Sequence, residues 1–132
     1  MSLHVSVTHA VGAITLDVTL DLPGGLTALA GHSGAGKTTL LHIIAGLIRP
    51  DRGRITLDGE TLADTARGID VAPHRRRIGC VFQEPRLFPH LTVRGNLQFG
   101  ARFAPVGAAG LSLDEVIDCC ALAPLAGRRV SR

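Results

Sequence analysis

The nine residues from Gly31 to Thr39 have types and a spacing that could hold a chain of phosphates. They read Gly-His-Ser-Gly-Ala-Gly-Lys-Thr-Thr and fit the pattern G-x-x-x-x-G-K-[ST] without a mismatch. Glycines at positions 31, 34 and 36 let the backbone approach an anion, because no Cβ atom stands in the way. Successive backbone N–H groups can then point at phosphate oxygens. The pattern therefore predicts a phosphate-binding loop.

The other residues of this loop have separate roles in the prediction. Lys37 is the only lysine of the chain, and it supplies a compact ammonium for the β- and γ-phosphates. The Thr38 hydroxyl is a ligand for Mg²⁺. The alternative is a glycine-rich turn that binds nothing. The predicted nucleotide-binding residues are Gly31, Ser33, Gly34, Ala35, Gly36, Lys37, Thr38 and Thr39.

A phosphate-binding loop must follow a strand and begin a helix. Residues 26–30 are a short apolar run of the kind found in a buried parallel strand. After the loop, Leu40, Ile43, Ile44 and Leu47 recur at the spacing of one helix face. The expected order of elements is therefore strand, loop and helix, which predicts an α/β fold.

Further strands are predicted on both sides of this unit. Residues 3–7 and 14–21 alternate between apolar and polar side chains and are expected to pair as an antiparallel β-subdomain. Residues 54–57 form a short strand, and the following Asp58-Gly59 is typical of a tight turn rather than of a magnesium-binding carboxylate. Residues 78–82 are a second candidate for a buried central strand, which ends at Gln83.

Two helices are predicted in the last third of the chain. The first is expected to begin at Val93 and to end near Phe99. The second begins after Ser112, because Ser112 and Glu115 have the spacing of a capping box.

Composition limits the partners that this chain of 132 residues can have. Its net charge is +3, and much of the positive charge comes from arginines at positions 75–77 and 128–129. A nucleic-acid surface is disfavoured, since the only aromatic residues are four phenylalanines and no nucleic-acid module is recognised. No apolar run approaches the roughly 18 residues of a membrane span.

Together, two motifs resemble those of ABC transporter ATPases over nearly the whole chain. Residues 31–40 look like their Walker A motif, and residues 73–84, Pro-His-Arg-Arg-Arg-Ile-Gly-Cys-Val-Phe-Gln-Glu, resemble their strand and Q-loop. Residues 86–97 are similar to the same segment in the ATPase subunits of molybdate importers. The resemblance implies an ABC-type P-loop nucleotide-binding domain. Sulfate, iron and polyamine importers are the near alternatives for the transported solute.

This resemblance implies roles for residues outside the loop. Gln83 would contact Mg²⁺ and the attacking water and would sense the γ-phosphate of ATP; taken alone, it could be merely a polar residue at a strand end. Residues 84–91 would dock on a membrane-embedded permease. The family also implies a homodimer of ATPase subunits at the cytoplasmic face of the membrane. Residues 1–92 would form the P-loop core and β-subdomain, and residues 93–132 the beginning of the helical subdomain.

The sequence departs from the family pattern in two ways. The place of the usual adenine-stacking aromatic residue is near Val11, and no Tyr or Trp is available. The 132 residues also contain no signature motif, no Walker B carboxylate and no switch histidine. We therefore expect little or no ATP hydrolysis by these residues alone. The alternatives are a soluble P-loop kinase or GTPase and an inactive, truncated nucleotide-binding fragment.

Overall fold

The computed structural model describes residues 1–103 and 110–130. These residues form two compact units, Met1–Val81 and Phe82–Arg132, which are described separately below. The predicted division into residues 1–92 and 93–132 follows motifs rather than contacts, and it stays a prediction. Its second part includes residues 104–109 and 131–132, which lie outside the described part of the chain.

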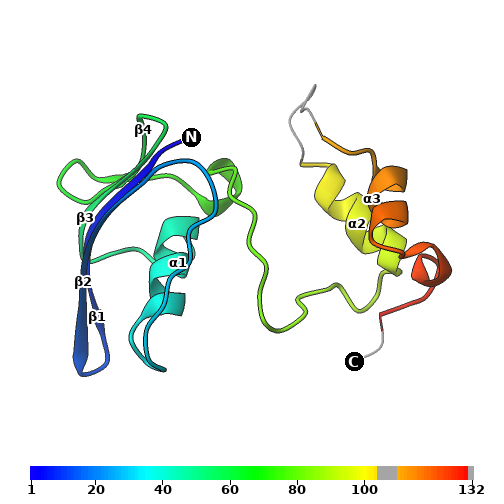
Figure 1. Ribbon diagram of the computed structural model, residues 1–132, viewed down its shortest axis with the longest axis horizontal. Coiled ribbons are helices and arrows are strands. Elements are labelled where there is room, and N and C mark those ends of the chain that lie inside the picture. The colour runs from blue at the N-terminus through cyan, green and yellow to red at the C-terminus, as the bar shows by residue number, and fades with distance from the viewer. Residues whose placement is uncertain (104–109, 131–132) are drawn as a thin grey trace. The chain divides into compact units, whose positions relative to one another are not determined.

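The first unit contains one antiparallel sheet of five strands with the order β2-β1-β3-β4-β5 (Figure 1). The alternation of side chains predicted two strands here, and the structure pairs the long β1 and β2 as a hairpin from Leu3↔Leu22 to Val11↔Ile14. The sheet confirms the expected N-terminal β-subdomain. The strands are β1 (Leu3–Val11), β2 (Ile14–Leu22), β3 (Arg52–Leu57), β4 (Glu60–Asp64) and β5 (Ile69–Asp70).

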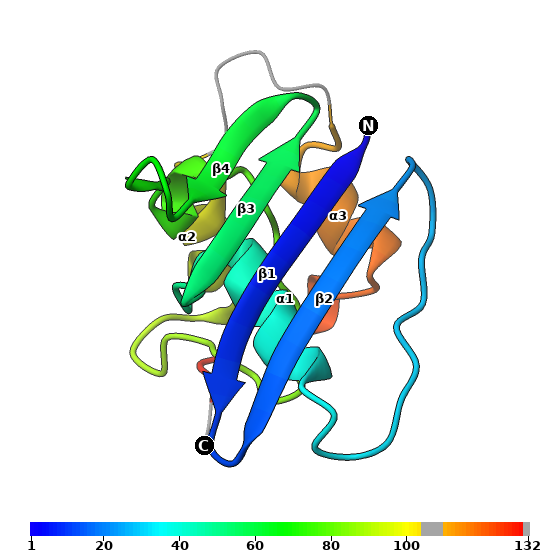
Figure 2. The same cartoon turned by 90° about the vertical axis from the view of Figure 1, so that its left-hand side faces the viewer.

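Helix α1 (Lys37–Ala45) lies against one face of this sheet (Figure 2). Its Leu40 and Ile43 belong to a buried cluster with Val5 and Val7 of β1 and with Ile55 of β3. Alternate residues of a strand point to opposite faces, so the apolar positions of β1 and β3 meet the helix while the polar positions between them remain outside. On the outer face, polar side chains pair across the strands, as in His4 with Asp21, Ser6 with Thr19 and Thr8 with Asp17.

Two predicted strands are absent from the described chain. Residues 26–30, before the loop, and residues 78–82, before Gln83, have no strand geometry and no sheet partner among the described residues. The prediction of these strands was wrong for this structure. An apolar run becomes a strand only when a neighbour accepts and donates its backbone hydrogen bonds. Without such a neighbour, Leu26 and Val81 are fully exposed.

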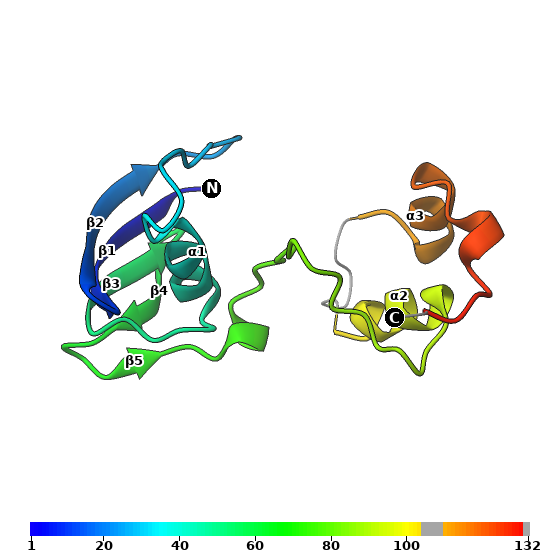
Figure 3. The ribbon, with the colours of Figure 1, turned by 90° about the horizontal axis from the view of Figure 1, so that it is seen from below.

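The second unit contains helices α2 (Val93–Ala101) and α3 (Leu113–Cys119), both near their predicted positions (Figure 3). The Thr92 side chain caps α2 by accepting from the backbone N–H of Gly95. Ser112 and Glu115 form the predicted capping box, and hydrogen bonds from the side chain and backbone of Ser112 lower the pKa of Glu115. None of the helices in the described ranges is long and apolar enough to cross a membrane.

Candidate functional site

At two positions of the loop before α1, the backbone has dihedral angles that are favourable only for glycine. Gly34 has φ of 81°, and Gly36, the N-cap of α1, has φ of 86° and ψ of 7°. Both values lie in the left-handed region, where a Cβ atom is strained. The positive end of the helix dipole is about half an elementary charge and lies at this N-terminus. Glycine positions and helix together have a geometry that can bind an anion, and phosphate binding by the loop stays a prediction.

A cavity of about 260 Å³ lies at the loop. One residue from outside the motif, Val11 at the end of β1, joins the loop in lining it. Gly31 and Ala35 are not part of this lining, although both belong to the predicted set. The loop residues that line the cavity are Ser33, Gly34, Gly36, Lys37, Thr38 and Thr39.

The Lys37 ammonium is held at the loop by backbone carbonyls. Its Nζ donates to the carbonyl oxygens of Gly31 and His32, both at 2.7 Å. Within residues 1–103 and 110–130, no carboxylate pairs with this ammonium. Since a lysine is charged at neutral pH, the loop has a positive charge that an anion can neutralise.

The described residues include no group of three or more His, Cys, Asp and Glu side chains that could hold a metal ion. The predicted magnesium ligand of the loop, Thr38, is exposed and lines the cavity. A single hydroxyl fits Mg²⁺ only if phosphates and water supply most of the other ligands, which is how this ion is usually held. The loop is therefore suited to a magnesium–nucleotide complex rather than to free magnesium.

Gln83 lies in the second unit, is exposed and belongs to a loop. Its role toward magnesium and the γ-phosphate stays a prediction. The adjoining residues 84–91 are also largely exposed, including Leu87 and Phe88. Apolar side chains gathered on an exposed loop are typical of a surface that a partner covers.

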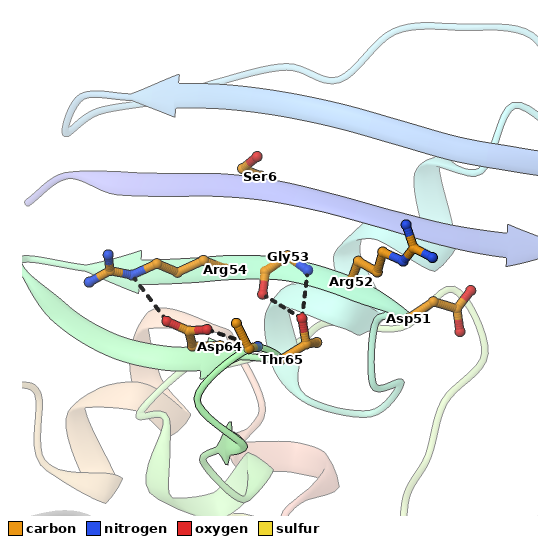
Figure 4. Close-up of a pocket in the computed structure, with 8 residues that line it drawn as sticks. Ser6, Asp51, Arg52, Gly53, Arg54, Asp64 and Thr65 are labelled. Carbon is orange, nitrogen blue, oxygen red and sulfur yellow. Dashed lines mark hydrogen bonds and ion pairs between the residues drawn. The ribbon is translucent and has the colours of Figure 1, made fainter.

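A second cavity, of about 640 Å³, lies beside strands β1, β3 and β4 (Figure 4). Both aspartates and one of the two arginines that line it already have a partner, Asp51 through the backbone N–H of Ala10. The Asp64 carboxylate accepts from the backbone N–H groups of Ala66 and Arg67, and it lies 3.9 Å from Nε of Arg54. The Thr65 hydroxyl is bonded to the backbone of Gly53. We therefore assign the chemistry of this unit to the loop.

Sequence reasoning missed Arg76, whose side chain is buried and fixes the far end of α1. Its Nη1 donates to the carbonyl oxygens of Ile43 and Ile44 at 3.0 and 2.9 Å, in the last turn of the helix. Its Nε donates to Val71 at 2.7 Å, and its Nη2 donates to the Asp70 carboxylate at 2.8 Å. Burial lowers the pKa of Arg76, while the charge of Asp70 opposes this effect. A run of three arginines usually indicates a solvated face, so the sequence carried no signal that the middle one is buried.

Comparison with known proteins places these features in a family. A family model described as ABC transporter matches residues 15–132. The chain is 48% identical over 132 residues to "Molybdenum import ATP-binding protein ModC" of Mesorhizobium japonicum, covering 100% of this chain and 36% of that protein. The protein of the same name from Rhizobium etli is 52% identical over 128 residues, covering 97% of this chain and 36% of its own. The chain thus spans about a third of the length of these curated relatives.

Solved structures agree with this fold. The ATP-binding cassette MJ0796, in a dimeric post-hydrolysis state bound to ADP and Pi, superposes with a TM-score of 0.71 at 26% identity. The match covers 96% of this chain and 61% of that cassette. A second dimeric structure of MJ0796, described as a bacterial ABC transporter cassette, gives the same TM-score at 25% identity. The predicted fold class, a partial P-loop nucleotide-binding domain of the ABC type, is confirmed.

Proposed function

The chain belongs to the ABC transporter family, and we propose that it is the ATP-binding part of an importer for molybdate or a related oxyanion. The observation that carries the proposal is the cavity at the loop, where the Lys37 ammonium, which has no carboxylate partner in the described chain, lies at the N-terminus of α1. The names of the relatives support the choice of molybdate, since they are molybdenum import proteins and cover nearly the whole chain.

We propose that ATP binds with its phosphates along the loop. The backbone amides near Gly34 and Gly36 would donate to phosphate oxygens, and Lys37 would exchange its two carbonyl partners for the β- and γ-phosphates. The Thr38 hydroxyl would ligate Mg²⁺, and Gln83 would meet the ion and the attacking water from the Q-loop. The printed 132 residues contain no Walker B carboxylate and no signature motif, so we propose that they bind ATP and hydrolyse little of it by themselves.

The proposed partners are a permease in the membrane and a second ATPase subunit. Residues 84–91 would contact the permease, and their exposed Leu87 and Phe88 support this assignment. The dimeric form of the cassette MJ0796 supports pairing of two ATPase subunits. The protein would then lie at the cytoplasmic face of the membrane as a peripheral subunit.

The proposed transport function can be tested by uptake in cells. Deleting the gene is expected to abolish high-affinity uptake of molybdate while leaving sulfate uptake intact, because the relatives are molybdenum importers. Uptake of labelled molybdate and sulfate is measured at nanomolar to micromolar concentrations, and a wild-type gene copy should restore it. Normal molybdate uptake in the deletion strain, or loss of sulfate uptake instead, would contradict the proposed substrate.

A second test asks whether the base of ATP lies beside Val11. This residue lines the cavity at the place where the family pattern has an aromatic residue that stacks on adenine. Val11→Tyr is expected to tighten binding of Mg·ATP about 5- to 150-fold, since stacking on a base contributes about 1–3 kcal/mol. Isothermal titration with Mg·ATP and with magnesium tripolyphosphate measures the effect. Only the nucleotide should gain affinity, and Val11→Leu is the control for size. An equal gain for tripolyphosphate would show that the base does not lie at Val11.

A further inference from the structure

The side chain of Asn96 on α2 uses both ends of its amide on the preceding loop. Its Oδ1 accepts from the backbone N–H of Phe88 at 2.7 Å, and its Nδ2 donates to the Phe88 carbonyl at 3.1 Å. The same Nδ2 donates to the Thr92 carbonyl at 3.0 Å, within the first turn of the helix. Three hydrogen bonds thus join one residue of α2 to both backbone groups of Phe88 and to the N-cap of the helix.

Among uncharged side chains, only Asn and Gln offer an acceptor and two donors in one plane. The pattern of partners fixes the orientation of the Asn96 amide. If its oxygen and nitrogen were exchanged, the Nδ2 donor would face the N–H donor of Phe88, and no hydrogen bond could form there. A carboxylate could accept from the N–H of Phe88 but could not donate to either carbonyl. The contact therefore requires an amide at this position.

The hydrogen bonds from Asn96 hold the backbone of Phe88 in place, and this in turn positions the Phe88 ring. The ring packs edge-on against Phe99 of α2, with centroids 4.6 Å apart, and lies 5.8 Å from the His90 ring. Phe88 nevertheless remains 39% exposed. An exposed aromatic side chain that is already ordered loses less conformational entropy when a partner covers it.

We propose that Asn96 is a positioning residue that holds Phe88 ready to dock on the permease. This inference rests on the proposed function, in which residues 84–91 contact that subunit. Asn96 itself need not touch the partner. A change at Asn96 should therefore affect docking only when Phe88 is present. A double-mutant cycle detects this dependence, because the effects of the two single changes then do not add.

The test measures binding of the protein to its purified permease in detergent for Phe88→Ala, Asn96→Asp and the double variant. Phe88→Ala is expected to weaken binding about 30-fold, as for a central aromatic anchor. Asn96→Asp should weaken it roughly 5-fold, because the loop must then be ordered on binding. An acidic residue near the start of α2 is favourable for the helix, so this variant should fold. The double variant should bind no more weakly than Phe88→Ala alone.

A matched control comes from the same helix. Gln98 is exposed, and Gln98→Glu makes the same change from amide to acid without touching the loop. It should leave permease binding unchanged, and all of these variants should bind Mg·ATP like the wild type. Normal docking by Asn96→Asp, or effects of the two single changes that add, would overturn the role of Asn96 while leaving the proposed function intact. Normal docking by Phe88→Ala would instead overturn the proposed permease contact, and the inference with it.

Discussion

Replacing Lys37 by alanine is expected to reduce the affinity for Mg·ATP at least 100-fold. The substitution removes the one loop charge that no carboxylate compensates in the described chain. Hydrogen bonds to charged groups contribute about 1.5–3 kcal/mol each, so losing two phosphate contacts amounts to about 3–6 kcal/mol, or roughly two to four orders of magnitude in Kd. Isothermal titration with Mg·ATP measures the change.

Two further measurements decide whether this effect is specific to the site. Lys37→Arg should also bind weakly, because a planar guanidinium does not occupy the place of a compact ammonium. The thermal midpoint without nucleotide should stay close to that of the wild type, since the hydrogen bonds of Lys37 are exposed. Wild-type affinity in Lys37→Ala would show that the loop is not the nucleotide site.

Replacing Arg76 by methionine is expected to lower the free energy of unfolding by about 2–4 kcal/mol, because a buried acceptor that loses its donor costs about 1–3 kcal/mol. Arg76 is only 2% exposed, and its loss removes the donor of the Ile44 carbonyl, while the Ile43 carbonyl keeps its bond from the Gly46 N–H at the end of α1. Asp70 contributes less to this loss, because its carboxylate is partly exposed and regains water. Urea unfolding followed by circular dichroism measures the change in midpoint.

Neighbouring arginines provide the comparison for Arg76. Arg75 is exposed, so Arg75→Met should change the free energy of unfolding by no more than about 0.5 kcal/mol. Arg76→Lys should fall between the two, because three donors on one atom cannot reach acceptors on three sides. Equal midpoints for Arg76→Met and Arg75→Met would show that the four hydrogen bonds contribute nothing to stability.

The loop, the first two strands and the helices could be predicted from the sequence because each depends on near neighbours. The glycines of residues 31–36 specify a turn by their own backbone freedom, and the period of α1 appears within a single window of sequence. The same is true of the capping box at Ser112 and of the alternation in β1 and β2. The family match also removes the alternative of a soluble P-loop kinase or GTPase.

Other features were decided only by the tertiary structure. Residues 26–30 and 78–82 have the composition of buried strands, yet they remain unpaired in the described chain, because a strand depends on a neighbour that is often far away in sequence. The middle of three arginines is buried because the carbonyls of α1 and the carboxylate of Asp70 surround it. Asn96 holds Phe88 because the loop folds back on α2. Composition reports which groups a segment carries, but only the fold determines which groups meet.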